Sequence, residues 1–131
     1  MTTITEDYVS YEVAKLLKEK GFDEQCRDFY RQENGNWLHR NTYEYNYFNL
    51  QMPRWEDCYS CPTHQMAMKW LREEKRISII IEFDLTKRGY CPYVYQLDYD
   101  MDWVVKWRIN TPMKYEEAVE AALKYALENL I

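Results

Sequence analysis

The sequence predicts a single α+β domain spanning residues 1–131, a small antiparallel β-sheet (a hairpin plus a three-stranded meander) with three helices packed on it. Segments whose apolar residues recur every three or four positions alternate with segments whose apolar residues recur every second position. Short connections between the strand-like segments favour antiparallel pairing. The chain has only 3 glycines and 4 prolines, so we expect neither a linker nor a second domain.

The first helix is expected over Tyr11–Lys20. Ser10 has the side chain of an N-cap, and Gly21 stands where a helix commonly ends in a left-handed conformation. The apolar stripe of this helix comprises Val9, Val13, Leu16 and Leu17.

A hairpin is expected next, because Asn34-Gly35 favours a type I′ turn. Its strands are predicted over Arg27–Glu33 and Asn36–Arg40. A third strand is predicted where Tyr43, Tyr45 and Tyr47 alternate with polar residues. The segment Leu50–Pro62 has no clear period and is expected to be a loop.

The second helix is predicted from Thr63, directly after a proline, to Glu74. Its inner face is expected to hold Met66, Ala67, Trp70 and Leu71. Three charged residues are expected to face water: Lys69, Arg72 and Glu73.

A three-stranded meander is predicted over Ile77–Leu85, Tyr93–Tyr99 and Trp103–Ile109. In its first strand we expect Ile79 and Ile81 to be buried and Glu82 and Asp84 to be exposed. In its second strand we expect the rings of Tyr93, Tyr95 and Tyr99 to pack at the edge of the core on the face of Leu97. In its third strand the alternation places one set of residues on a single face: Trp103, Val105, Trp107 and Ile109.

The last helix is predicted to open at Thr111-Pro112, a cap residue followed by a first-turn proline. Glu116 and Glu117 suit the positive end of its dipole. Its apolar stripe is expected to comprise Ala118, Val119, Ala122, Tyr125, Ala126 and Leu130.

Charge and targeting signals exclude several classes of protein. The 17 basic and 22 acidic side chains give a net charge of −5, which argues against nucleic acid as a partner because nucleic-acid-binding domains usually carry a basic excess. No apolar run approaches the ~20 residues needed to span a bilayer, so no membrane partner is expected. The N-terminus lacks the basic and apolar regions of a secretory signal. We therefore expect a cytoplasmic protein whose four cysteines are thiols.

Cys58, Cys61 and His64 form the only cluster in the sequence that resembles a metal site. The Cys-x-x-Cys spacing allows two thiolates to hold one zinc ion, and His64 supplies a third ligand. A fourth would come from Cys26, His39 or Cys91. No second ligand pair with zinc-binding spacing follows, so the spacing favours two ordinary thiols in a loop and no metal. A zinc-binding module or a small enzyme built on these residues remains the alternative reading.

Catalytic motifs are otherwise missing from the sequence. There is no glycine-rich phosphate loop and no Gly-x-Ser-x-Gly turn. Only two histidines are present, and His64 is expected to lie on the surface of a first helical turn. The sequence therefore favours a protein that is not an enzyme, with no cofactor and no identifiable small-molecule substrate.

The 13 tyrosines suggest a role in binding. Tyr43, Tyr45 and Tyr47 lie on a strand that is otherwise polar, and tyrosine is enriched at protein interfaces. We expect this row either to join a core or to contact another protein or a second copy of the chain.

Three stretches, Val13–Asp23, Cys61–Glu74 and Tyr115–Ile131, resemble a family of small uncharacterised proteins of Bacteroides-type gut bacteria and their phages or integrated elements. The resemblance implies a bacterial cytoplasm and a phage or mobile-element origin, but it brings no activity, cofactor or site residue. The leading expectation is therefore a small non-enzymatic protein-binding or regulatory protein, with self-association through a tyrosine-rich surface as one form of that binding.

Overall fold

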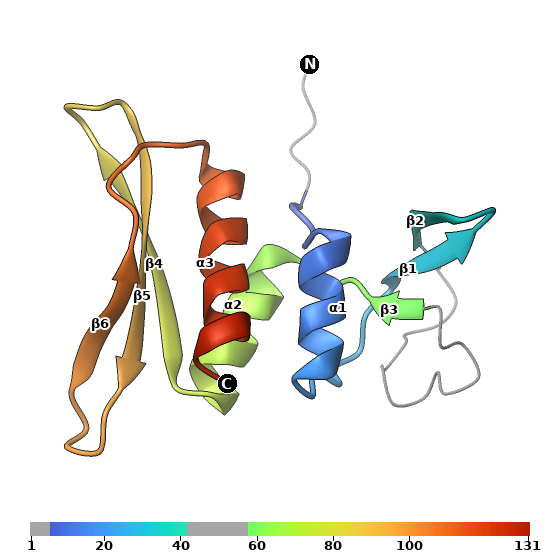
Figure 1. The fold of residues 1–131 in the computed structure, drawn as a ribbon, viewed down its shortest axis with the longest axis horizontal. Coiled ribbons are helices and arrows are strands. Elements are labelled where there is room, and N and C mark those ends of the chain that lie inside the picture. The colour runs from blue at the N-terminus through green and yellow to red at the C-terminus, as the bar shows by residue number, and fades with distance from the viewer. Residues whose placement is uncertain (1–5, 42–57) are drawn as a thin grey trace. The chain divides into compact units, whose positions relative to one another are not determined.

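The computed structural model describes residues 6–41 and 58–131 of the chain. These residues form three helices and two three-stranded antiparallel sheets, which confirms the predicted α+β class (Figure 1). The chain divides into two compact units, Met1–His64 and Gln65–Ile131, and each unit contains one sheet. The boundary lies inside helix α2 (His64–Glu74). A single domain without a linker stays a prediction.

In the N-terminal unit, helix α1 (Tyr11–Glu19) has both predicted caps. The Ser10 hydroxyl accepts a hydrogen bond from the backbone N–H of Val13 at 3.2 Å. At the other end Gly21 adopts a φ of 95°. The N–H groups of Gly21 and Phe22 then donate to the carbonyls of Lys18 and Leu17 at 3.2 and 2.9 Å, a pattern that satisfies the last turn and stops the helix.

The sheet of this unit has the order β2-β1-β3. Strands β1 (Asp28–Glu33) and β2 (Asn36–Asn41) form the predicted hairpin, and both turn residues, Asn34 and Gly35, have the positive φ of a type I′ turn. The prediction of a loop is wrong at β3 (Cys58–Ser60), which pairs antiparallel with β1. Three residues are too few to show alternation, so only backbone pairing identifies this strand.

Aromatic rings join α1 to its sheet. Tyr11 of α1 stacks on Trp37 of β2, with ring centroids 4.5 Å apart. Tyr11 also lies within 6.0 Å of the rings of Tyr30 on β1 and Tyr59 on β3. Lys18 Nζ donates to the Cys58 carbonyl at 3.0 Å and lies 5.2 Å from the Tyr59 ring centroid. Amphipathic rings therefore supply much of the packing in this small unit.

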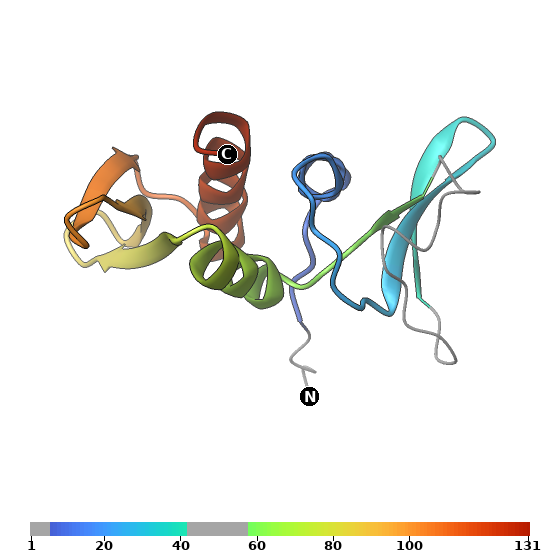
Figure 2. The ribbon, with the colours of Figure 1, turned by 90° about the horizontal axis from the view of Figure 1, so that it is seen from below.

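The C-terminal unit contains the predicted meander, in the order β4-β5-β6. Its strands are β4 (Ile77–Asp84), β5 (Gly89–Leu97) and β6 (Trp103–Arg108). Helices α2 and α3 (Tyr115–Asn129) lie on the same side of this sheet (Figure 2). The buried residues of α3 are Ala118, Val119, Ala122, Leu123, Ala126 and Leu127. Leu123 and Leu127 thus take the buried places that were predicted for Tyr125 and Leu130, which are only half-buried.

The buried face of α2 differs from the prediction at two residues. Ala67, Trp70 and Leu71 are buried as expected, but Met68 is buried and Met66 is exposed. Positions 64, 67, 68 and 71 are spaced by three or four residues, so they lie on one side of the helix. Lys69, Arg72 and Glu73 are exposed as predicted.

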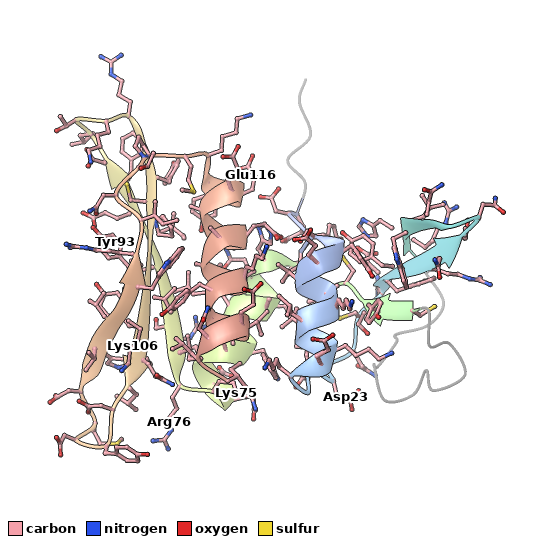
Figure 3. All side chains as sticks on the ribbon, viewed as in Figure 1. Asp23, Lys75, Arg76, Tyr93, Lys106 and Glu116 are labelled. Atoms are coloured by element: carbon pink, nitrogen blue, oxygen red, sulfur yellow. The ribbon has the colours of Figure 1, made fainter. Side chains whose placement is uncertain are left out.

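Helix α3 begins at Tyr115, three residues later than the predicted proline. Two backbone hydrogen bonds to Tyr90 of β5 hold Met113 in an extended conformation. The Tyr90 N–H donates to the Met113 carbonyl at 2.9 Å, and the Met113 N–H donates to the Tyr90 carbonyl at 3.0 Å. This bridge explains why the segment from Thr111 to Met113 stays out of the helix. Glu116 and Glu117 occupy the first turn as expected, and Figure 3 shows Glu116 at this end of α3.

Strand β4 is less buried than predicted. Ile77 is fully buried, but Ile79 and Ile81 are only half-buried, since β4 is an edge strand that the helices cover in part. Glu82 is exposed as expected. Asp84 is half-buried rather than exposed, because its carboxylate accepts hydrogen bonds from two backbone N–H groups of the following turn, at 2.9 and 3.0 Å.

Candidate protein-binding surface

The β4-β5-β6 sheet has one face that the helices cover and one that they do not. Ile79, Val94 and Trp107 are aligned across the three strands. Trp107 stacks on Tyr125 of α3, with centroids 4.9 Å apart and ring planes 9° apart. This row therefore marks the face that α3 covers. The neighbouring row, Ile80, Tyr93 and Arg108, points to the opposite face because successive side chains of a strand alternate.

A β-bulge in β6 determines which residues reach the uncovered face. The register shifts between Val94 and Tyr95, so that Val94 pairs with Trp107 and Tyr95 pairs with Val105. Lys106 is the extra residue, and its carbonyl accepts a hydrogen bond from the Tyr125 hydroxyl at 3.4 Å. The prediction that Trp103, Val105, Trp107 and Ile109 share one face is therefore wrong: the bulge separates the first two from Trp107.

The uncovered face is apolar and aromatic, and we call it the open face. Its apolar members are Ile80, Tyr93, Tyr95, Leu97, Trp103 and Val105. Ile80, Trp103 and Val105 are 47–49% exposed. Tyr93, Tyr95 and Leu97 are half-buried by their neighbours in the sheet. Figure 3 shows Tyr93 on the side of the sheet away from α3.

The position of Tyr93 also corrects the prediction for the tyrosines of β5. Tyr93 and Tyr95 share a face with Leu97 as expected, but this is the open face and not the edge of the core. Their rings stack on one another, with centroids 6.4 Å apart. Tyr99, predicted to pack with them, lies beyond β5 and is fully exposed. An exposed patch of this kind on a small protein commonly marks a site of interaction.

Two opposite charges flank Tyr93 on the open face. The nearby Glu82 carboxylate is the main cause that raises the pKa of Tyr93, and Arg108 acts in the opposite direction. Glu82 comes from β4 and Arg108 from β6, the two outer strands. The open face thus has an acidic side, an aromatic centre and a basic side.

The predicted zinc candidates lie elsewhere. Cys58 is buried in β3, so it belongs to a strand and not to a loop. The Cys61 thiol donates to the Val9 carbonyl at 3.4 Å. His64 begins α2 and is buried, whereas a surface position was expected. Within residues 6–41 and 58–131, no three His, Cys, Asp or Glu side chains are arranged to hold a metal ion. Both of these cysteines, and also Cys26 and Cys91, are buried thiols that form no disulfide.

The tyrosine row predicted as an interface, Tyr43, Tyr45 and Tyr47, lies outside the described residues. Its role stays a prediction. The tyrosines and tryptophan that the structure brings together on the open face come from other strands.

One cluster in the N-terminal unit was missed by the sequence analysis. His39 Nε2 lies 3.3 Å from Asp28 Oδ2, and the Asp28 side chain is only 4% exposed. A hydrogen bond to Asp28 raises the pKa of the Tyr8 hydroxyl, and burial raises it further. The Asn34-Gly35 turn sets a hairpin register that pairs Tyr30 with His39 and so brings His39 close to Asp28. The contact between His39 and Asp28 could therefore have been predicted from the sequence of the turn. The cluster ties the segment before α1 to the hairpin.

Comparison of the chain with protein families, with curated proteins and with solved structures finds no match. Among the described helices, none has the length and apolar character required to cross a bilayer. The structure itself shows an α+β protein in which one apolar face of the β4-β5-β6 sheet is not covered by helices.

Proposed function

We propose that this chain is a small non-enzymatic protein-binding or regulatory protein that contacts its partner through the open face. The observation that carries the proposal is the half-exposure of Ile80, Trp103 and Val105 on one side of a single sheet. Such residues gain most from burial against another apolar surface, at about 25 cal/mol per Å². Aromatic and apolar groups surrounded by polar ones are the composition of an interface core with its rim.

A cytoplasmic site of action and a phage or mobile-element origin belong to the same proposal. They are supported by the resemblance of the segments Val13–Asp23, Cys61–Glu74 and Tyr115–Ile131 to small proteins of gut bacteria and their phages or integrated elements. The predicted Tyr43, Tyr45 and Tyr47 surface would extend this binding role to the N-terminal unit.

In-cell photo-crosslinking tests the proposal. A photo-crosslinking amino acid replaces Trp103 on the open face or, as the matched control, Arg72 on the exposed side of α2. We expect discrete protein adducts from position 103 and none from position 72. If position 103 gives no adduct, or if both positions give the same adducts, the open face is not a binding surface.

A further inference from the structure

The charges of the β4-β5-β6 sheet are divided by strand. Strand β4 carries two acidic residues, Glu82 and Asp84, and no basic one. Strand β6 carries two basic residues, Lys106 and Arg108, and no acidic one. The central strand β5 carries no charged residue. The open face thus runs from acidic to basic across its width.

This division makes the open face complementary to itself. A two-fold axis parallel to β5, between two stacked sheets, sets β4 of one copy opposite β6 of the other. Glu82 is level with Cys91 and Arg108 is level with Tyr93, so Glu82 lies about 7 Å along the strand from Arg108 of the second copy. These two long side chains can bridge that offset, and the same contact occurs twice. An axis perpendicular to the strands would instead set β4 against β4 and β6 against β6, with like charges on facing strands. Like charges that face one another oppose association.

The centre of the face fits the same arrangement. Tyr93 and Tyr95 lie on β5 and therefore on the axis, where each ring meets the rings of the other copy. Trp103 and Val105 extend the apolar contact along β6. Strands of stacked sheets usually run within about 30° of one another, as this axis requires.

We infer that the partner of the open face is a second copy of this chain, bound face to face about a two-fold axis along β5, with Glu82 of each copy against Arg108 of the other. The inference rests on the proposed function of the open face.

The size of the face indicates a reversible dimer. Strand β4 has 8 residues, which gives a length of about 27 Å, and three strands span about 14 Å. The face therefore offers roughly 400 Å² of sheet per copy, which is below the ~800 Å² per partner of a standard stable interface. Such a dimer is expected to dissociate on dilution.

Charge reversal tests the pairing by sedimentation over a range of concentrations. We expect Glu82→Arg alone and Arg108→Glu alone each to weaken association by about tenfold or more, because each sets two pairs of like charges together. The double variant Glu82→Arg/Arg108→Glu is expected to regain wild-type association. An equimolar mixture of the two single variants is expected to form a heterodimer, since each then meets its opposite charge. Glu73→Arg on the exposed side of α2 is the matched control and leaves association unchanged.

Two results would overturn the inference, and they separate it from the proposed function. A wild-type chain that stays monomeric, while position 103 crosslinks to a different protein, excludes the second copy but retains the open face as a binding surface. A wild-type dimer that none of the charge reversals weakens shows that the copies meet elsewhere. Rescue in both the double variant and the mixture is the result that supports the pairing, because misfolding cannot produce it.

Discussion

The substitution Gly89→Ala tests whether β5 packs against the segment before α3 as closely as the structure shows. A Cβ atom built at Gly89 would lie 2.4 Å from Pro112 Cβ and 3.2 Å from Met113 N. Carbon atoms in contact normally lie about 3.5–4.0 Å apart. Because the proline ring is rigid, the segment from Pro112 to Met113 must move outward by about 1 Å.

The expected cost follows from the contacts that this movement breaks. The two hydrogen bonds between Tyr90 and Met113, of 2.9 and 3.0 Å, adjoin the new methyl group. Losing both costs about 2 kcal/mol. Residual overpacking adds about 1 kcal/mol. We therefore expect Gly89→Ala to lower the free energy of unfolding by about 3 kcal/mol.

Urea denaturation followed by circular dichroism measures this change, and hydrogen exchange locates it at the amides of Tyr90 and Met113. Gly21→Ala is the matched control. No atom lies within 4 Å of a Cβ at Gly21, so this variant pays only for its φ of 95°, about 1 kcal/mol. A Gly89→Ala variant as stable as wild type, with both amides still protected, would refute the close packing of this segment.

Three further predictions concern the two tryptophans of β6, the buried thiol of Cys26, and the ion pair between Glu33 and Arg40. Trp107→Ala should lower the free energy of unfolding by about 2–3 kcal/mol, because it removes a half-buried ring stacked on α3. Trp103→Ala, on the open face, should lower it by only about 1 kcal/mol. If urea denaturation shows equal losses for the two variants, the assignment of the two residues to opposite faces is wrong. Burial raises the pKa of Cys26 to about 12 from its ordinary 9.0, so this thiol should resist iodoacetamide at pH 8 in the folded chain. Because the unfolded chain releases that proton first, stability should fall between about pH 9 and 12, and Cys26→Ala should remove this part of the pH dependence. A hydrogen bond from Arg40, 2.7 Å long, lowers the pKa of Glu33, so the contact stabilises the hairpin above the ordinary glutamate pKa and is lost as pH falls through the lowered one. In an NMR titration Arg40→Ala should raise the pKa of Glu33, and an unchanged titration would show that the pair does not form.

Local patterns were sufficient to predict most elements of the fold. The Asn34-Gly35 dipeptide predicted both the type I′ turn and the pairing of β1 with β2, because few turn types have a positive φ at two successive residues. Alternation was sufficient for the existence of β4, and Ser10 and Gly21 marked both ends of α1. Each of these signals lies within a few residues of the structure that it predicts.

The inward face of β4 was predicted correctly, because Ile79 lies on the face that α3 covers. The faces of β5 and β6 were not predicted, because apolar residues occur on both sides of these two strands. In β6 the bulge at Lys106 reverses the alternation between Val105 and Trp107. The residue types around Lys106 do not indicate a β-bulge, so the open face could not be predicted from the sequence.

The candidate interface illustrates the same limit. Sequence reasoning favoured tyrosines with polar neighbours, whereas the open face gathers aromatic and aliphatic residues from three strands that also looked suitable for a core. Long-range packing alone distinguishes the two cases. The cluster of Asp28 and His39 was within reach, because it follows from the hairpin register.

The bulge in β6 also controls how this sheet can grow. A regular edge strand is a template on which further chains add by backbone hydrogen bonding, and a chain with two such edges can polymerise into a fibre. Here the ladder of β6 is interrupted at Lys106, which is positively charged, and a second positive charge follows at Arg108, while the aliphatic edge of β4 stays regular. With only the β4 edge of this sheet able to template, strand addition through this sheet is expected to end after two chains. The same extra residue that turns Trp103 outward is therefore expected to oppose the growth of fibres through this sheet, in which β4 is rich in isoleucine.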